Sequence, residues 1–212
     1  MKTVYFVRHG ESGTNTSDVW VGDSIGLTEK GKQQAEYVAS RCTKLPIDVV
    51  ISSTIPRAKE TAEIIKNKIT KPIEFSDLFA ERKWPTEQLG LPKDDPKSNE
   101  IRRIIWDNFS DPNFRYSDEE NFNDLKERIK KAFIFLENRP EEKILVVTHG
   151  FVLRMILAHV VMGEELTAIE CDQFVDKFHT KNTGLSIIHY GKTDKRTRWH
   201  LSVWNDHAHL AD

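Results

Sequence analysis

Cysteine, methionine and long apolar runs are all scarce in this 212-residue chain, which has two cysteines and three methionines. Cys42 and Cys171 are too few and too far apart for a disulfide framework or a cysteine-based metal site. We expect both to be structural thiols. No apolar run approaches the roughly 20 residues that a membrane-spanning helix needs, which argues against a membrane as partner.

Charge of one sign is also lacking, since 31 basic residues face 33 acidic ones and the net charge is −2. This balance gives no reason to expect nucleic acid as a partner. Glycine and proline are few, at 10 and 8, and no low-complexity linker divides the chain. The first apolar run begins almost at the N-terminus, which leaves no room for a signal peptide and predicts a cytoplasmic location.

Strand-like and helix-like patterns alternate along the chain. The predicted strands are 2–7, 47–52, 72–75, 143–148, 184–190 and 198–204, and the predicted helices are 28–43, 55–69, 97–109, 118–138 and 151–162. This alternation predicts an α/β fold, with residues 1–212 forming a single three-layer α/β/α domain around a mostly parallel sheet. Residues 83–120, rich in proline, aspartate and asparagine, are expected to form an insertion that covers the active site.

Two of the predicted strands each end in a histidine. Val4–Val7 runs into Arg8, His9 and Gly10, and residues 144–147 run into Thr148-His149-Gly150. Because ligands of open α/β sheets gather at the carboxyl ends of the strands, both histidines are expected at one edge.

The chemistry of these residues suggests phosphoryl transfer. A neutral imidazole near its usual pKa of about 6.5 is a nucleophile that needs no separate base. The adjacent guanidinium of Arg8 can bind phosphate oxygens bidentately, and Gly10 lets the backbone approach an anion. The sharp hypothesis is a phosphohistidine at His9. For Arg-His-Gly alone, a strand that simply ends at the surface is the better interpretation.

A further arginine changes that balance. The predicted strand 47–52 is followed by Pro56, which suits the first turn of a helix, and by Arg57. Arg57 then lies where the helix dipole and free backbone N–H groups already favour an anion. Together with Arg8, His9 and His149 it completes a predicted phosphate pocket.

These segments resemble the histidine phosphatase superfamily, which is phosphoglycerate mutase-like, and specifically its branch 1. The resemblance extends over nearly the whole chain. It rests on five short motifs in the same order as in the family: Arg8-His9-Gly10-Glu11-Ser12 with Asn15, the segment 27–35, Ser52-Ser53 to Arg57-Ala58 with Thr61-Ala62, Thr148-His149-Gly150, and Asn182-Thr183-Gly184.

The resemblance implies a role for each matching position. His9 is expected to be the phosphorylated nucleophile. Side chains expected to hold the phosphoryl oxygens and stabilise their charge are those of Arg8, Arg57 and His149, with Asn15 and the backbone N–H of Gly150 as secondary candidates.

The family also uses an acidic residue to protonate the leaving oxygen. Glu81, which precedes Arg82, fits this place best, and Glu87 is a rival. Proton donation at neutral pH needs a carboxyl group that keeps its proton, which burial beside Trp84 would favour. The alternative for Glu81 is a solvated loop position.

The expected activity is hydrolysis of small phosphomonoesters, with a small phosphorylated metabolite as partner. A cofactor-dependent phosphoglycerate mutase is one alternative. Mutases of the family usually carry a longer insertion between the acid and the second histidine, so the resemblance implies that the short stretch between Glu81 and His149 favours the phosphatase. The Glu-Arg pair at 81–82 favours the mutase. A weakly active phosphate-binding regulatory module is another alternative. We expect no cofactor and no metal, because Arg8 and Arg57 supply the positive charge. The sequence leaves the substrate undefined and a homodimer as one option.

Three other groups of residues have patterns that could mark a site. Arg102-Arg103 could reach a second anionic group, but a solvated helix face is the better interpretation. The basic run 192–198 is interpreted as a solvated hairpin rather than a nucleic-acid patch. His207 and His209 have the spacing of a metal pair, yet no further ligand accompanies them, so a polar C-terminal tail is expected.

Overall fold

A computed structural model describes residues 1–193 and 196–210. Its centre is a six-stranded sheet with the order β3-β2-β4-β1-β5-β6. The strands are β1 (Lys2–Arg8), β2 (Val49–Ser52), β3 (Ile73–Phe75), β4 (Lys143–Thr148), β5 (Leu185–Thr193) and β6 (Arg196–Asp206). Strands β3, β2, β4 and β1 are parallel, while β5 pairs antiparallel with β1 on one side and with β6 on the other. The predicted α/β fold with a mostly parallel sheet is confirmed.

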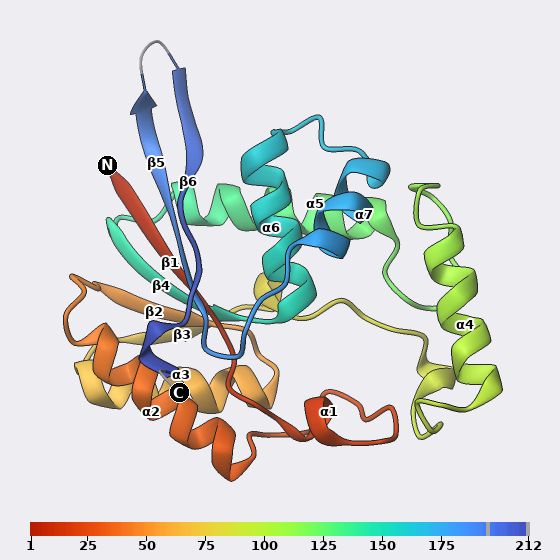
Figure 1. The fold of residues 1–212 in the computed structure, drawn as a ribbon. Coiled ribbons are helices and arrows are strands. Elements are labelled where there is room, and N and C mark those ends of the chain that lie inside the picture. Colours follow the sequence, from red (N-terminus) through yellow and green to blue (C-terminus); the bar gives the residue numbers. More distant parts are fainter. Residues whose placement is uncertain (194–195, 211–212) are drawn as a thin grey trace.

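Helices cover both faces of this sheet (Figure 1). The α-helices are α1 (Gly13–Thr16), α2 (Glu29–Cys42), α3 (Pro56–Ile69), α4 (Pro96–Asp107), α5 (Phe122–Glu137), α6 (Gly150–Met162) and α7 (Ala168–Lys177). Short 3₁₀ turns are η1 (Asp77–Phe79), η2 (Thr86–Gln88) and η3 (Ala208–Leu210). Helices α2 and α3 form one outer layer, and α5, α6 and α7 form the other.

The central strand β1 shows why its sequence is apolar throughout. Val4 and Phe6 pack in the core beneath α5 and α6, whereas Tyr5 and Val7 pack in the core beneath α2 and α3. Successive side chains of a strand point to opposite faces, so a strand covered on both sides needs apolar residues at every position. Strand β4 repeats the arrangement beside it.

Several predicted boundaries shift by a few residues. The helix predicted from 118 begins at Phe122, because Asn121 caps it and accepts the N–H of Asp124 at 3.0 Å. Helix α7 was not predicted, although Thr167 and Glu170 form a capping box at its start. The strands of the C-terminal hairpin are longer than predicted.

No helix in the described ranges is long and apolar enough to cross a membrane. Cys42 lies in α2 and Cys171 in α7, and both thiols are free and buried. Burial raises the pKa of each to about 12, which leaves both as unreactive thiols.

Candidate active site

The parallel pairing of β1 with β4 places the two histidines side by side. Arg8 is the register partner of Thr148, and the N–H of His9 donates to the Thr148 carbonyl at 2.9 Å. The imidazole rings of His9 and His149 lie 5.0 Å apart between centroids, tilted by 58°. The sheet edge thus holds both histidines, as the strand pattern predicts.

His9 is held in a defined tautomer. Its side chain is buried, and its Nδ1 lies 2.7 Å from the carbonyl oxygen of Gly10, an acceptor only. The ring proton must therefore reside on Nδ1, which leaves the lone pair on Nε2. Burial, followed by the charges of Arg57 and Arg8, lowers the pKa of His9 well below its usual value. A neutral, nucleophilic imidazole results.

The two arginines carry unused hydrogen-bond donors. Within the part of the chain that the structure describes, Nε of Arg8 and both Nε and Nη1 of Arg57 are buried without a partner. Arg8 donates from Nη1 to the carbonyl of Thr180 at 2.5 Å, and Nη2 of Arg57 lies 3.5 Å from the Asp23 carboxylate. Buried guanidinium donors without acceptors fit an arriving oxyanion.

Helix α3 fixes Arg57 in its first turn, after Pro56 at the first helical position. Thr61 ties this turn to the histidine loop: its Oγ1 donates to the Arg57 carbonyl at 2.7 Å and accepts the Gly10 N–H at 3.1 Å. The motif that contains Thr61 predicts no role for this residue. Its hydrogen bonds explain why the motifs of β1 and α3 occur together.

Glycines allow three close approaches around the histidine. A Cβ on Gly10 would lie 2.4 Å from the Gly31 carbonyl oxygen, and one on Gly31 would lie 1.9 Å from the Glu11 carbonyl oxygen. Helix α2 therefore packs directly against the loop after β1, which accounts for the motif at 27–35. At Gly150 a Cβ would lie 3.3 Å from Nε of Arg8, so the glycine leaves room for the guanidinium.

The side chain of Glu81 contacts the N-terminus of helix α6. Its carboxylate accepts the N–H groups of Phe151 at 3.2 Å and Val152 at 3.1 Å, and it lines the cavity that holds His9. Glu87 forms an ion pair with Lys97 at 3.3 Å and is absent from the residues that line this cavity. The geometry thus favours Glu81 over Glu87 as a group that can meet a substrate.

The secondary candidates lie nearby. Asn15 lines the cavity, and its Oδ1 accepts the N–H of Ser12 at 3.0 Å. Gly150 is the first residue of α6, next to His149. Asn182, which belongs to the motif Asn182-Thr183-Gly184, donates from Nδ2 to the His9 carbonyl at 2.9 Å.

The cavity has a volume of about 290 Å³. Besides the residues above, its wall includes Trp20, Asp23, Lys83, Trp84, Gln88, Leu89 and Lys93. Backbone hydrogen bonds join Trp20 to Leu91 at 2.9 Å and Gly90 to Trp20 at 2.8 Å. The segment 83–93 and the loop after α1 therefore close the cavity together.

Arg82, the neighbour of Glu81 in the sequence, also lines the cavity, although the sequence pattern predicts no role for it. It is 4% exposed and lies within 5.5 Å of four aromatic ring centroids, among them Trp84 and Phe151. Burial lowers its pKa to about 10. The arginine thus lies between aromatic side chains of the segment 84–109 and the start of α6.

The remaining sequence candidates lie apart from this cavity. Arg103 pairs with Asp107 on an exposed helix face, and Arg102 lies 5.6 Å from the Trp20 ring centroid, outside the cavity lining. The run 192–198 falls on the antiparallel strands β5 and β6, but residues 194–195 lie outside the described residues. His207 and His209 have different partners, the Asn205 carbonyl and the Thr183 hydroxyl, so the tail is docked rather than free.

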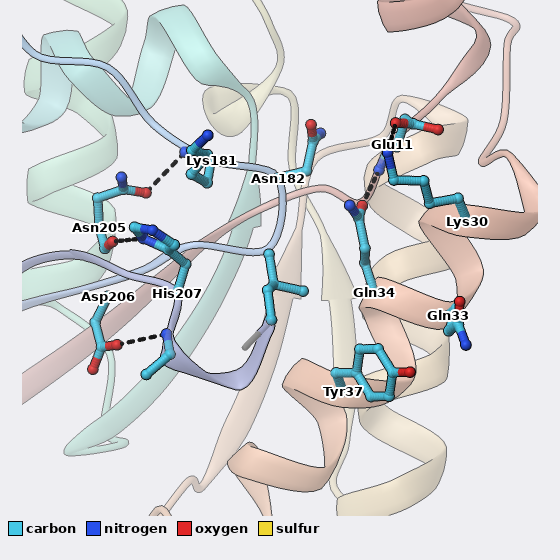
Figure 2. A pocket seen from close by; sticks show the side chains of 12 residues that line it. Glu11, Lys30, Gln33, Gln34, Tyr37, Lys181, Asn182, Asn205, Asp206 and His207 are labelled. Carbon is cyan, nitrogen blue, oxygen red and sulfur yellow. Dashed lines mark hydrogen bonds and ion pairs between the residues drawn. The ribbon is translucent and has the colours of Figure 1, made fainter. Parts of the chain in front are cut away.

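A second, larger cavity of about 940 Å³ opens near the C-terminal segment (Figure 2). Asn182 and Lys181 lie on one side of it and Tyr37 of α2 on another. It lacks His9, Arg8 and Arg57. We therefore assign the candidate active site to the smaller cavity.

Comparison with known proteins agrees with this geometry. The family model of the histidine phosphatase superfamily (branch 1) matches residues 4–207, and the chain belongs to that superfamily. It is 26% identical to "Uncharacterized phosphatase PhoE" of Bacillus subtilis (strain 168), over 100% of this chain and 98% of the relative. It is 30% identical to "Probable phosphoglycerate mutase GpmB" of Escherichia coli O1:K1 / APEC, over 96% and 90%. The solved structure of Bacillus stearothermophilus YhfR superposes with a TM-score of 0.82 at 26% identity, covering 99% and 100%.

Proposed function

We propose that the protein is a phosphatase that hydrolyses small phosphomonoesters through a phosphohistidine at His9. One observation carries this proposal: a neutral imidazole with a free Nε2 lies beside buried guanidinium groups whose donors lack acceptors. A phosphoryl group bound there supplies the missing oxygens and lies next to the nucleophile. Membership of the superfamily and the likeness to a relative named as a phosphatase support it.

In the first step, Arg8, Arg57 and His149 bind the three non-bridging oxygens of the phosphoryl group. Nε2 of His9 attacks phosphorus, and the bond to the leaving oxygen breaks. Glu81 gives its proton to that oxygen, so an alcohol departs. The arginines bind the charge that is spread over the oxygens in the transition state.

In the second step, water attacks the phosphohistidine. Glu81, now a carboxylate, accepts a proton from the water, the bond between phosphorus and Nε2 breaks, and inorganic phosphate leaves. The enzyme returns to its starting state. For both proton transfers, one carboxyl oxygen of Glu81 must release the α6 backbone N–H that it accepts.

The proposed reaction needs neither a metal nor a cofactor, because the guanidinium groups supply the positive charge that metal ions supply elsewhere. Undiminished turnover in excess chelator tests this point. We place the reaction in the cytoplasm, with a small phosphorylated metabolite as the partner. The two free thiols agree with a reducing compartment, and cell fractionation tests the location.

Two alternatives differ in what happens to the phosphoryl group. A mutase returns it to the substrate, and the likeness to a relative named as a probable phosphoglycerate mutase favours that reading. A regulatory module binds phosphate without turnover. The decisive assay measures phosphate release from a panel of phosphomonoesters, with 3-phosphoglycerate plus 2,3-bisphosphoglycerate run in parallel. Release without isomerisation supports the phosphatase, and isomerisation without release supports the mutase. The absence of both reactions supports the regulatory module.

A further inference from the structure

Ser53 is a buried hydroxyl that the proposed mechanism does not use. It follows β2 directly, and its N–H donates to the Val147 carbonyl at 3.0 Å, which fixes it against β4. Its Oγ lies 2.8 Å from Nε2 of His149, and both side chains have no exposed surface. Nδ1 of His149 is buried and has no partner among the residues that the structure describes.

The hydrogen atoms around Ser53 can be counted. Its Oγ accepts the N–H of Ile55 at 3.1 Å, and a hydroxyl has one proton to donate. Among the described residues, the ring nitrogen of His149 is the one acceptor for this proton. If Ser53 donates to Nε2, the imidazole proton resides on Nδ1, and only that proton lacks a partner.

The opposite arrangement satisfies fewer groups. If Nε2 donates to Ser53, the hydroxyl proton has no acceptor and Nδ1 presents an unpaired lone pair, so two buried groups are unsatisfied instead of one. Each such group is unfavourable. A bound phosphoryl dianion would make this arrangement still less favourable, because its oxygens accept hydrogen bonds and repel a lone pair on Nδ1.

We propose that Ser53 holds His149 in the Nδ1–H tautomer, so that this neutral imidazole offers a hydrogen-bond donor to the phosphoryl group bound at His9. Ser53 is then a positioning residue that acts through His149. The proposal depends on the proposed function for its substrate, yet the tautomer itself does not depend on turnover. Burial lowers the pKa of His149 well below its usual value, which agrees with a ring that carries one proton.

The first test is nitrogen-15 NMR of the full-length protein labelled at histidine. For His149 we expect the chemical shift of a protonated Nδ1 and an unprotonated Nε2 at pH 7.5. Assignment uses a His149→Gln variant, whose spectrum lacks these two signals. A protonated Nε2 in the unmodified protein would overturn the proposal directly.

The second test compares two neighbouring serines. Ser53→Ala should shift the His149 ring toward the Nε2–H form and weaken binding of inorganic phosphate by about ten-fold, the equivalent of one lost hydrogen bond. Ser52 has no exposed surface either, but its hydroxyl donates to the Ser53 carbonyl at 2.9 Å, so Ser52→Ala is the matched control and should change neither property. Ser53→Thr, which keeps the hydroxyl, should restore both.

The outcomes separate this proposal from the proposed function. An unchanged tautomer and unchanged phosphate affinity in Ser53→Ala would refute the role of Ser53 even in an active phosphatase. An Nδ1–H tautomer that depends on Ser53, in a protein without turnover on any phosphomonoester, would uphold the tautomer and refute the phosphatase. If Ser53→Ala does not fold, the NMR spectrum of the unmodified protein still decides the question.

Discussion

The rings of His9 and His149 lie 5.0 Å apart, and burial lowers the pKa of both well below the usual value. Neither ring has a carboxylate within salt-bridge distance in the described part of the chain. The paired imidazoles are thus both neutral, with the guanidinium groups of Arg8 and Arg57 supplying the charge. A dianion can bind there without first displacing a proton from the nucleophile.

Substitution of the nucleophile gives the first prediction. His9→Ala should remove phosphoenzyme formation and lower turnover by at least about 10³-fold, because Nε2 of His149, the other imidazole of the pocket, is hydrogen-bonded to Ser53. Phosphohistidine is hydrolysed in acid, so the reaction is quenched with alkali and the phosphoenzyme is measured by mass spectrometry. His207→Ala, which changes an exposed histidine near the C-terminus, is the control and should form the phosphoenzyme to the same extent as the unmodified protein. Labelling of His9→Ala would contradict the assignment of the nucleophile.

The role of Glu81 gives a prediction about leaving groups. Glu81→Gln should lower kcat/KM for alkyl phosphates by roughly 10²-fold or more, and for aryl phosphates with acidic leaving groups by less than about ten-fold. Alkyl leaving oxygens need a proton in the transition state, whereas good aryl leaving groups do not. Glu87→Gln is the matched control, since Glu87 pairs with Lys97 away from the cavity. Equal losses on both substrate types would rule out Glu81 as the acid.

The buried histidines predict how stability depends on pH. Below about pH 6.5 the unfolded chain takes up protons at His9 and His149 that the folded chain does not, because their pKa values are lowered on folding. The contribution of these two histidines to the free energy of unfolding should therefore be complete above this pH. It should decrease as the pH falls, by up to about 1.4 kcal/mol per pH unit for each histidine.

Urea unfolding at pH 7.5 and 5.5 measures this dependence. The variant His149→Gln should lose less stability between the two pH values than the unmodified protein, because one of the two groups no longer titrates. An identical loss in both proteins would contradict the neutral state of His149 in the fold.

The ion pair between Asp23 and Arg57 predicts competition with phosphate. The carboxylate of Asp23 is 70% exposed and lies 3.5 Å from Nη2 of Arg57, where a phosphoryl oxygen is expected to bind. Asp23→Asn should tighten the binding of inorganic phosphate by roughly two- to five-fold, the size of an exposed ion pair. Asp18→Asn removes the same charge from the same loop and should have a smaller effect. Weaker phosphate binding in Asp23→Asn would show that Asp23 assists binding instead.

The contact of Gly31 with the Glu11 carbonyl predicts an unusual helix substitution. Alanine normally stabilises a helix relative to glycine by about 1 kcal/mol. Gly31→Ala should instead destabilise the protein by about 2 kcal/mol or more, because the added Cβ would lie 1.9 Å from a backbone oxygen. Thermal unfolding measures this change. At Gly22 the nearest atom to an added Cβ is 3.9 Å away, so Gly22→Ala should be nearly neutral.

Local pattern predicted much of this fold because its causes are local. The apolar runs of β1 and β4 mark strands buried on both faces, and Pro56 marks the start of α3. Helix α7 was missed despite its capping box, because it is only 10 residues long and polar residues interrupt its apolar ones. The start of α5 was misplaced because Glu119, a residue type that favours helices, lies just before Asn121. In the structure Glu119 instead holds a turn by accepting the N–H of Tyr116 at 2.5 Å.

The sequence by itself determined that His9 and His149 end two buried strands and that Arg57 begins a helix, because strand alternation and helix capping depend on neighbouring residues. Only the tertiary structure decided which groups meet at the site. Three such contacts join residues far apart along the chain: Glu81 with the start of α6, Asp23 with Arg57, and Ser53 with His149. Such contacts depend on how loops close over the sheet edge, and no local pattern specifies that closure.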